Sequence, residues 1–205
     1  ITEVLAGRRL LDVTDPKGWQ HSAESTGRTR HVGVIMGDVD ARVRAVNPLV
    51  ELKVPFAVSR AELDAIDRGA CDANLDSVRT AARDAAIAED TAVFHGFEAG
   101  GIAGVVPATP NEAVTIDSDY EKYPSAVAQA VAKLKTGGVA GPYAIALGPR
   151  CYTGVVEQSE MGGYPVLKHL ELILGGPVIF APGVNGAIVA SLRGGDAEIV
   201  RHQHQ

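Results

Sequence analysis

The chain has 205 residues, of which 46% are hydrophobic, and its formal net charge is −6 at pH 7. A chain of this length and composition buries one large core or two small ones, and it is too apolar to be intrinsically disordered. The modest negative charge argues against a general nucleic-acid-binding protein, because such proteins display a clustered basic face.

The two cysteines, Cys71 and Cys151, are too few for a disulfide framework, and neither lies near a second ligand at the spacing of a metal site. No apolar run approaches the roughly 20 residues that span a bilayer. The first residues, Ile-Thr-Glu-Val, carry no basic segment of the kind that begins a secretory signal. We therefore expect a soluble protein of the reducing cytoplasm.

Taken in chain order, the first clear element is a β-hairpin. From Asp38 to Arg44 every even position is charged and every odd position is apolar or small, which is the period of a strand. Residues 28–32 are the expected partner strand, with Met36, Gly37 and Asp38 as the turn. Two placements stay open: the hairpin lies at the edge of its own domain, or it projects onto another subunit.

The segment after the hairpin predicts a strand and then a short helix. Apolar residues alternate over residues 52–58, and Pro55 favours a position at a sheet edge. Ser59 and Glu62 have the spacing of a capping box, so a helix is expected over residues 59–68, with Gly69 at its end.

A long helix is predicted over residues 74–96, where small alanines let another element approach closely. The second half of the chain alternates short helices and strands, which indicates a compact α/β unit of ordinary domain size. Its expected helices are residues 124–136 and 165–174, and its expected strands are residues 143–147, 178–180 and 187–192.

No catalytic motif is found, whether a G-x-S-x-G elbow, a P-loop, a C-x-x-C or an H-E-x-x-H. The glycine-rich run from Gly96 to Gly104 follows a helix, so it is interpreted as a turn between domains and not as a phosphate loop. Glu89 and Asp90 are adjacent in a helix and point about 100° apart. We expect one to pair with a base from elsewhere and the other to be solvated.

Ten short motifs occur in an order that resembles the family 1 encapsulins, the linocin-like encapsulating shell proteins. They cover nearly the whole chain: Leu5–Val13, Gly18–Trp19, Pro55–Phe56, Glu62–Asp64, Arg68–Gly69, Ala88–Asp90, Phe94–Gly96, Gly141–Tyr143, Gly163–Pro165 and Arg193–Asp196.

The resemblance implies an α+β fold of the Hong Kong 97-type phage major capsid class. Residues 1–24 and 55–99 would form the peripheral domain with its spine helix, residues 25–54 the extended loop, and residues 100–205 the axial domain and a truncated C-terminal segment. In this family the extended loop lies along a neighbouring subunit.

The implied function is that of a non-catalytic shell subunit that self-assembles into an icosahedral nanocompartment in the cytoplasm. The family encloses cargo enzymes, commonly ferritin-like iron-storage oxidases or dye-decolourising peroxidases, each carrying a targeting peptide. No nucleic acid, membrane, metal or cofactor is expected as a partner. The alternative is a prophage major capsid protein that packages nucleic acid; an α/β-hydrolase-like enzyme is disfavoured because its nucleophile motif is missing.

Two groups of site residues are carried over from the resemblance. Arg8, Leu10, Asp12 and Val13 match positions that help line the groove for the cargo peptide, and Glu160, Met161, Gly162 and Gly163 match the loop around the five-fold pore. An apolar stripe flanked by charges suits a short peptide, because apolar pockets supply affinity and charge sets register. The other interpretation is that Arg8 and Asp12 simply pair with each other.

The sequence also departs from the family pattern. Family members have an additional N-terminal helix and further C-terminal strands, and we expect neither within residues 1–205. The position where some members stack a flavin on a tryptophan is Ala61, so no flavin is expected. Gly163 replaces the pore-loop histidine of the family, so pH gating through that side chain is not expected either.

Overall fold

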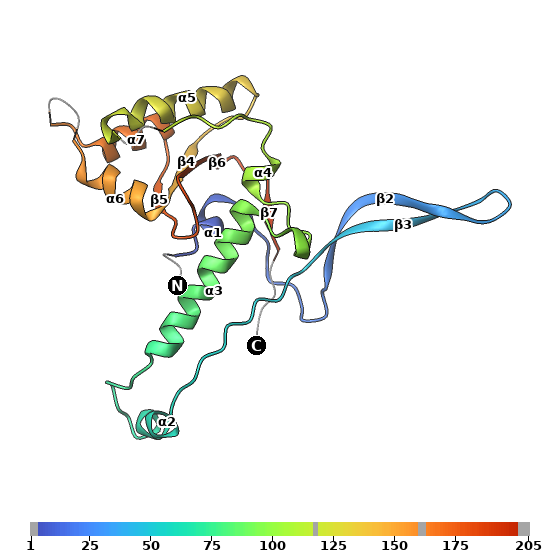
Figure 1. Cartoon of the computed structure of the whole chain (residues 1–205), viewed down its shortest axis with the longest axis horizontal. Coiled ribbons are helices and arrows are strands. Elements are labelled where there is room, and N and C mark those ends of the chain that lie inside the picture. The colour runs from blue at the N-terminus through green and yellow to red at the C-terminus, as the bar shows by residue number, and fades with distance from the viewer. Residues whose placement is uncertain (1–3, 117–118, 160–162, 201–205) are drawn as a thin grey trace.

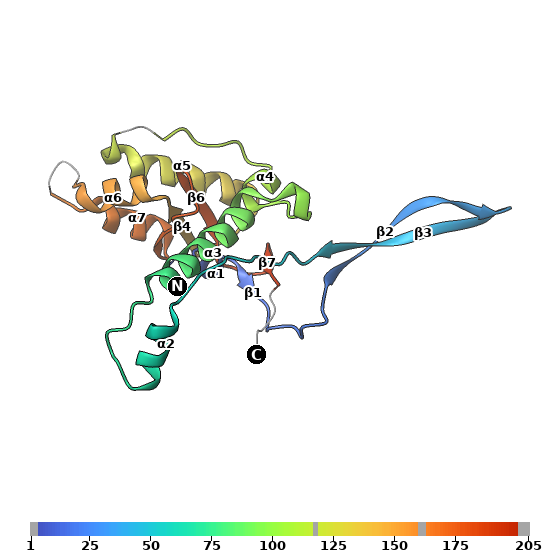
Figure 2. The same ribbon diagram turned by 60° about the horizontal axis from the view of Figure 1, so that its bottom comes forward.

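A computed structural model describes residues 4–116, 119–159 and 163–200 (Figure 1). A body of helices and strands carries a long hairpin that projects from one side, and the long helix α3 leads away from the body to the short helix α2. Figure 2, a view turned by 60°, shows the hairpin extending clear of the body in the same way.

The predicted hairpin is confirmed. Strands β2 (Ala23–Met36) and β3 (Val39–Pro48) are antiparallel and are joined by a turn at residues 37–38. They form a two-stranded sheet of their own within the described residues and project from the body, so the placement of the hairpin at the edge of its own domain is wrong. That the hairpin lies on another subunit stays a prediction.

The two faces of the hairpin differ in chemistry. Val39, Ala41 and Val43 share one face with Met36, which pairs with Val39, and with Arg30, which pairs with Val43. This face is therefore apolar near the turn. The opposite face carries Asp40 and Arg42: Asp40 Oδ1 lies 2.7 Å from His31 Nε2, and Asp40 Oδ2 lies 2.8 Å from Arg42 Nε. Val34, which pairs with Asp40, also lies on this face. The apolar face is covered by nothing in the described part of this chain: Val39 is 53% exposed and Met36 76%.

The predicted strand over residues 52–58 is wrong. Residues 49–59 belong to no strand, and Leu52 and Phe56 are exposed. Alternation of apolar residues produces a strand only where a neighbouring strand offers its backbone groups. The hairpin's two strands pair with each other, and none of the other described strands reaches this segment.

The short helix α2 (Arg60–Asp67) is capped at both ends, as predicted. Ser59 Oγ accepts a hydrogen bond from the Glu62 N–H at 3.2 Å. Gly69, at φ +92°, donates to Ile66 O, and Ala70 donates to Ala65 O, which together form a Schellman motif. The predicted long helix is also confirmed: α3 runs over Asp76–His95 and buries Ala81, Ala86, Asp90 and Phe94.

The second half folds around a three-stranded sheet of order β5-β4-β6. Strand β4 (Tyr143–Leu147) is parallel to β5 (Val178–Phe180) and antiparallel to β6 (Ala187–Ser191). All three strands were predicted, as were helices α5 (Tyr123–Thr136) and α7 (Val166–Leu174).

Helix α6 (Pro149–Glu157) was not predicted. Its central Gly154 disfavours a helix locally, but a Cβ at this position would lie 2.2 Å from the ring of Tyr120. The glycine is therefore explained by close packing between the helix and that aromatic ring, and tertiary contact overrides the local propensity.

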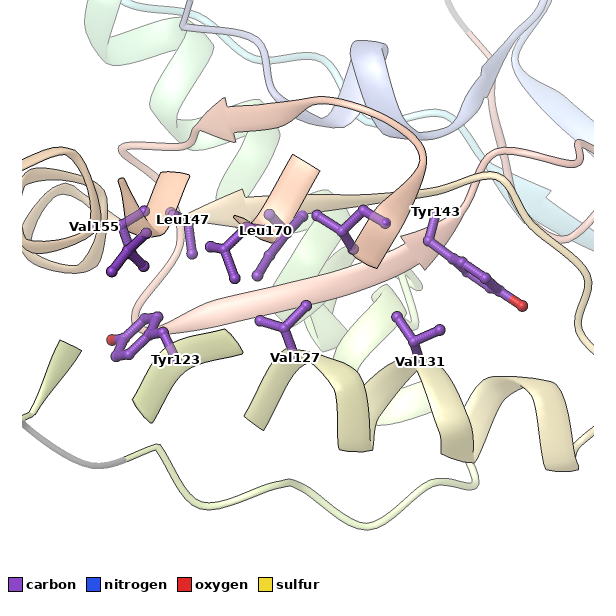
Figure 3. Packing of buried hydrophobic residues seen from close by; sticks show 10 residues of the cluster. Tyr123, Val127, Val131, Tyr143, Leu147, Val155 and Leu170 are labelled. Atoms are coloured by element: carbon purple, nitrogen blue, oxygen red, sulfur yellow. The ribbon is translucent and has the colours of Figure 1, made fainter. Parts of the chain in front are cut away.

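Strand β4 is buried on both faces. Tyr143, Ile145 and Leu147 point to one side, where they pack with residues of α5, α6 and α7 (Figure 3). Ala144 and Ala146 point to the other side, into a second cluster with Ala6, Leu10, Phe94 and Ile179. Because alanine is small, the N-terminal segment and the end of α3 approach the sheet closely on this side.

Several short elements complete the chain. They are α1 (Gly7–Leu10), β1 (Asp12–Val13), the 3₁₀ turns Glu98–Gly100 and Tyr120–Lys122, α4 (Val105–Ala108) and β7 (Glu198–Ile199). Strand β7 is parallel to β1, so residues 198–199 lie beside residues 12–13 and outside the three-stranded sheet. None of the described helices is long and apolar enough to cross a membrane.

Replacing Leu170 with alanine should lower the free energy of unfolding by about 3 kcal/mol, because a buried side chain between α7 and the sheet is replaced by a cavity. The matched control is Leu172→Ala in the same helix, where the side chain is 72% exposed and a change of less than about 0.5 kcal/mol is expected. Chemical denaturation measured on both variants tests this, and equal losses would contradict the described packing.

Candidate functional site

The four residues expected to line a peptide groove lie on α1 and β1, next to the last turns of α3. Arg8 and Val13 are partly buried, and Asp12 is exposed. Leu10 is buried in the cluster on the alanine face of β4.

Arg8 is paired with Glu89 and not with Asp12, so the interpretation that Arg8 and Asp12 pair with each other is wrong. Arg8 Nε donates to Glu89 Oε1 and Arg8 Nη2 donates to Glu89 Oε2, both at 2.6 Å. This two-point hydrogen bond raises the pKa of Arg8. The pair fixes Arg8 over α3, and it fulfils the expectation that one of the two adjacent acids meets a base from elsewhere.

Asp90 is fully buried, so the expectation that the second acid is solvated is wrong. Its carboxylate accepts hydrogen bonds from the backbone N–H groups of Ala6 at 2.8 Å and Gly7 at 2.9 Å. Burial raises the pKa of Asp90, and the two N–H donors offset part of that rise. Asp90 thereby anchors the start of α1 to the middle of the molecule.

Glycines let the backbone close around this carboxylate. A Cβ at Gly7 would lie 3.1 Å from Asp90 Oδ1, and a Cβ at Gly183 would lie 2.9 Å from Asp90 Cβ. Gly183 precedes β6 in the α/β unit, so Asp90 brings the N-terminal segment, α3 and that unit together at one point.

A hollow of about 180 Å³ adjoins Leu10 and Asp12. It lies between the N-terminal segment and the chain around the Arg193-Gly-Gly-Asp196 motif, and it combines apolar, basic and acidic side chains. Its lining residues are Arg9, Leu10, Leu11, Asp12, Ser191, Leu192, Gly194, Asp196 and Ala197. No sequence pattern marks this juxtaposition, because the two sides are far apart along the chain.

The expected pore residues Glu160, Met161 and Gly162 lie outside the described residues. Gly163 is exposed, with φ +80°, and shortly precedes α7. The glycine-rich run Gly96–Gly104 connects α3 to α4, and that it separates two domains stays a prediction. Across residues 4–116, 119–159 and 163–200, no cluster of three or more His, Cys, Asp or Glu side chains has the arrangement of a metal site.

Comparison with known proteins identifies the class. The family described as "Encapsulating protein for peroxidase" matches residues 1–204. A type 1 encapsulin shell protein of Rhodospirillum rubrum is 47% identical over 97% of this chain and 73% of that protein. Shell proteins of the same name from Brevibacterium linens and Mycobacterium tuberculosis are 42% and 41% identical, each over 95% of this chain and 73% of the relative.

The chain belongs to this family of encapsulin shell proteins, and the resemblance seen in the sequence is confirmed. The family match, together with the mixture of helices and strands, also confirms the expected α+β capsid-type fold. A virus-like particle from Pyrococcus furiosus, known from its crystal structure, aligns with a TM-score of 0.49 at 17% identity, over 85% of this chain and 72% of that one.

Asp90→Ala should destabilise the protein by roughly 2 kcal/mol, because two buried backbone N–H groups lose their acceptor. The control is Asp84→Ala, an exposed aspartate of the same helix, for which a change of less than about 0.5 kcal/mol is expected. The pKa of Asp90 is raised in the folded state, so its stabilising contribution is largest below the ordinary aspartate pKa and falls as the pH rises through the raised value.

Denaturation of both variants between pH 4 and pH 8 measures these effects. The gap between the wild type and Asp90→Ala should narrow as the pH rises. A gap that widens towards neutral pH would show that the ionised carboxylate is the better-stabilised form and that burial does not dominate its pKa.

Proposed function

We propose that this chain is a non-catalytic subunit of a closed icosahedral nanocompartment that encloses a cargo enzyme in the cytoplasm. Peripheral, extended-loop and axial parts would correspond to residues 1–24 with 55–99, 25–54, and 100–205. Family membership supports the shell role. The structural feature that supports assembly is the projecting hairpin formed by β2 and β3.

The projecting hairpin has an apolar face that no other described part of the chain covers. Met36 and Val39 at its tip are 76% and 53% exposed. A two-stranded ribbon is only marginally stable by itself in water. A second copy of the chain that covers this face would bury apolar area and stabilise the ribbon, so the observation favours assembly over a free monomer.

The cargo would bind through a targeting peptide at Arg8, Leu10, Asp12 and Val13, beside the hollow described above. This hollow supplies apolar side chains for affinity and carboxylates for orientation. The family description favours a peroxidase as cargo, and a ferritin-like iron-storage enzyme is the second candidate. Small ions and substrates would pass a pore lined by Glu160, Met161, Gly162 and Gly163.

Mass photometry and negative-stain microscopy of the purified full-length protein test this proposal. Hollow particles of megadalton mass are expected, and their ultraviolet absorbance should be that of protein without nucleic acid. A stable monomer or dimer would overturn the shell proposal. Particles filled with nucleic acid would instead favour the prophage capsid alternative, which the net charge of −6 disfavours.

Val39→Asp should prevent assembly, because it places a charge on the hairpin face that we propose to be covered by a second subunit. Val39→Ile keeps the apolar surface at the same position and should assemble like the wild type. Particle mass by mass photometry is the readout, with circular dichroism to show that both variants fold. Full assembly of Val39→Asp would show that this face is not an interface.

A further inference from the structure

Arg193 connects the loop of residues 193–196 to the chain just after α5 through its guanidinium group. Nε lies 2.8 Å from Asp196 Oδ2 and Nη2 lies 2.5 Å from Asp196 Oδ1, so the two side chains meet in a two-point ion pair. The remaining nitrogen, Nη1, donates to the carbonyl oxygen of Gly138 at 3.1 Å, just beyond the end of α5. The loop is thereby tied to the α/β unit.

The two glycines between Arg193 and Asp196 determine the shape of the loop. Gly194 and Gly195 have φ values of +80° and +79°, a conformation that other residues rarely adopt. This conformation directs the Gly195 N–H to Asp12, whose Oδ2 accepts the hydrogen bond.

Asp12 is consequently held through its backbone and through its side chain. The Asp12 N–H donates to Ala197 O at 3.3 Å, and the Thr14 N–H donates to Ile199 O at 3.0 Å. The carboxylate is fixed by Gly195. Asp12, Gly194 and Asp196 also line the same hollow, so the loop and the candidate peptide-binding residue form two sides of one surface.

We propose that the Arg193–Asp196 pair is a positioning clamp for the peptide groove. The pair presents the Gly195 N–H to Asp12 Oδ2. The other oxygen, Asp12 Oδ1, would then accept a hydrogen bond from an N–H group of the bound peptide. The inference rests on the peptide-binding role proposed above. Arg193 and Asp196 act through Asp12, so they are positioning residues and not contacts that supply affinity themselves.

Charge supports this geometric role. An exposed ion pair contributes little to global stability, but the two-point geometry of arginine and carboxylate fixes orientation. Arg193 lowers the pKa of the Asp196 carboxyl, so the clamp stays charged above that lowered pKa and is lost only as the pH falls through it.

A double-mutant cycle on full-length, assembled shells tests the clamp. The variants are Arg193→Ala, Asp12→Ala and the combination of both, with Asp196→Asn as a second way to break the pair. The control is Arg60→Ala, which removes an exposed arginine paired with Asp64 on α2. Mass photometry confirms that each variant still forms particles.

Two readouts separate the clamp from the proposed function. Hydrogen exchange of residues 11–14 in peptide-free shells reports whether Asp12 is held. Fluorescence anisotropy reports binding when the shells are disassembled and reassembled in the presence of the fluorescein-labelled targeting peptide of a dye-decolourising peroxidase cargo, so that the peptide has access to the proposed groove. Arg193→Ala and Asp196→Asn should speed this exchange and weaken peptide binding about tenfold, and Arg60→Ala should change neither.

The combined variant should bind no more weakly than Asp12→Ala alone, because both substitutions remove the same interaction. Losses that add up, or unchanged exchange in Arg193→Ala, would overturn the clamp. A wild-type shell that does not bind the peptide would overturn the proposed groove and the peptide role of the clamp, and the exchange data would then show separately whether Arg193 holds Asp12.

Discussion

Burial of strand β4 on both faces determines the placement of the other elements. Large side chains at Tyr143, Ile145 and Leu147 form the interior of the α/β unit, and alanines at 144 and 146 allow the N-terminal segment and the end of α3 to pack on the reverse side. Each face buries its own cluster, so one short strand joins two cores. A larger residue on the alanine face would force these elements apart.

The candidate groove depends on this close approach. Ala6 and Leu10 rest on the alanine face, and Asp90 holds the N–H groups that begin α1. A buried carboxylate is tolerated because each of its oxygens has a backbone donor, which replaces part of the lost hydration. The exposed edge at Asp12 is in turn placed by residues near the C-terminal end of the described chain. The candidate groove is therefore lined by segments that are distant in sequence.

Local patterns in the sequence sufficed for the hairpin, the capped helix α2, the long helix α3 and the three strands of the main sheet. They failed where tertiary contact decides the structure. The alternating apolar residues 52–58 have no partner strand. Helix α6 could not be predicted because Gly154 disfavours a helix locally, and this glycine is explained only by its contact with the ring of Tyr120. Strands β1 and β7 each have only two residues, so neither is long enough to show an alternating pattern in the sequence.

For the candidate site, the sequence motifs proposed positions but did not give the partners of those residues. Glu89 lies 81 residues from Arg8, and Gly195 lies 183 residues from Asp12. No local pattern reports contacts at such separations. The adjacent acids Glu89 and Asp90 do face different directions, as their helical spacing predicts, and only the fold shows that one of these directions leads into the interior.

The contact between Gly96 and Gly104 has a consequence for the architecture of a closed particle. A Cβ at Gly104 would lie 2.3 Å from the Gly96 nitrogen, and one at Gly96 would lie 2.8 Å from Ala103 O, so the joint after α3 has no room for a side chain. The joint therefore fixes the direction in which the chain leaves α3 and enters α4. In a shell of the proposed kind this direction is repeated in every copy, and a small change would alter the curvature and with it the number of subunits that close the particle.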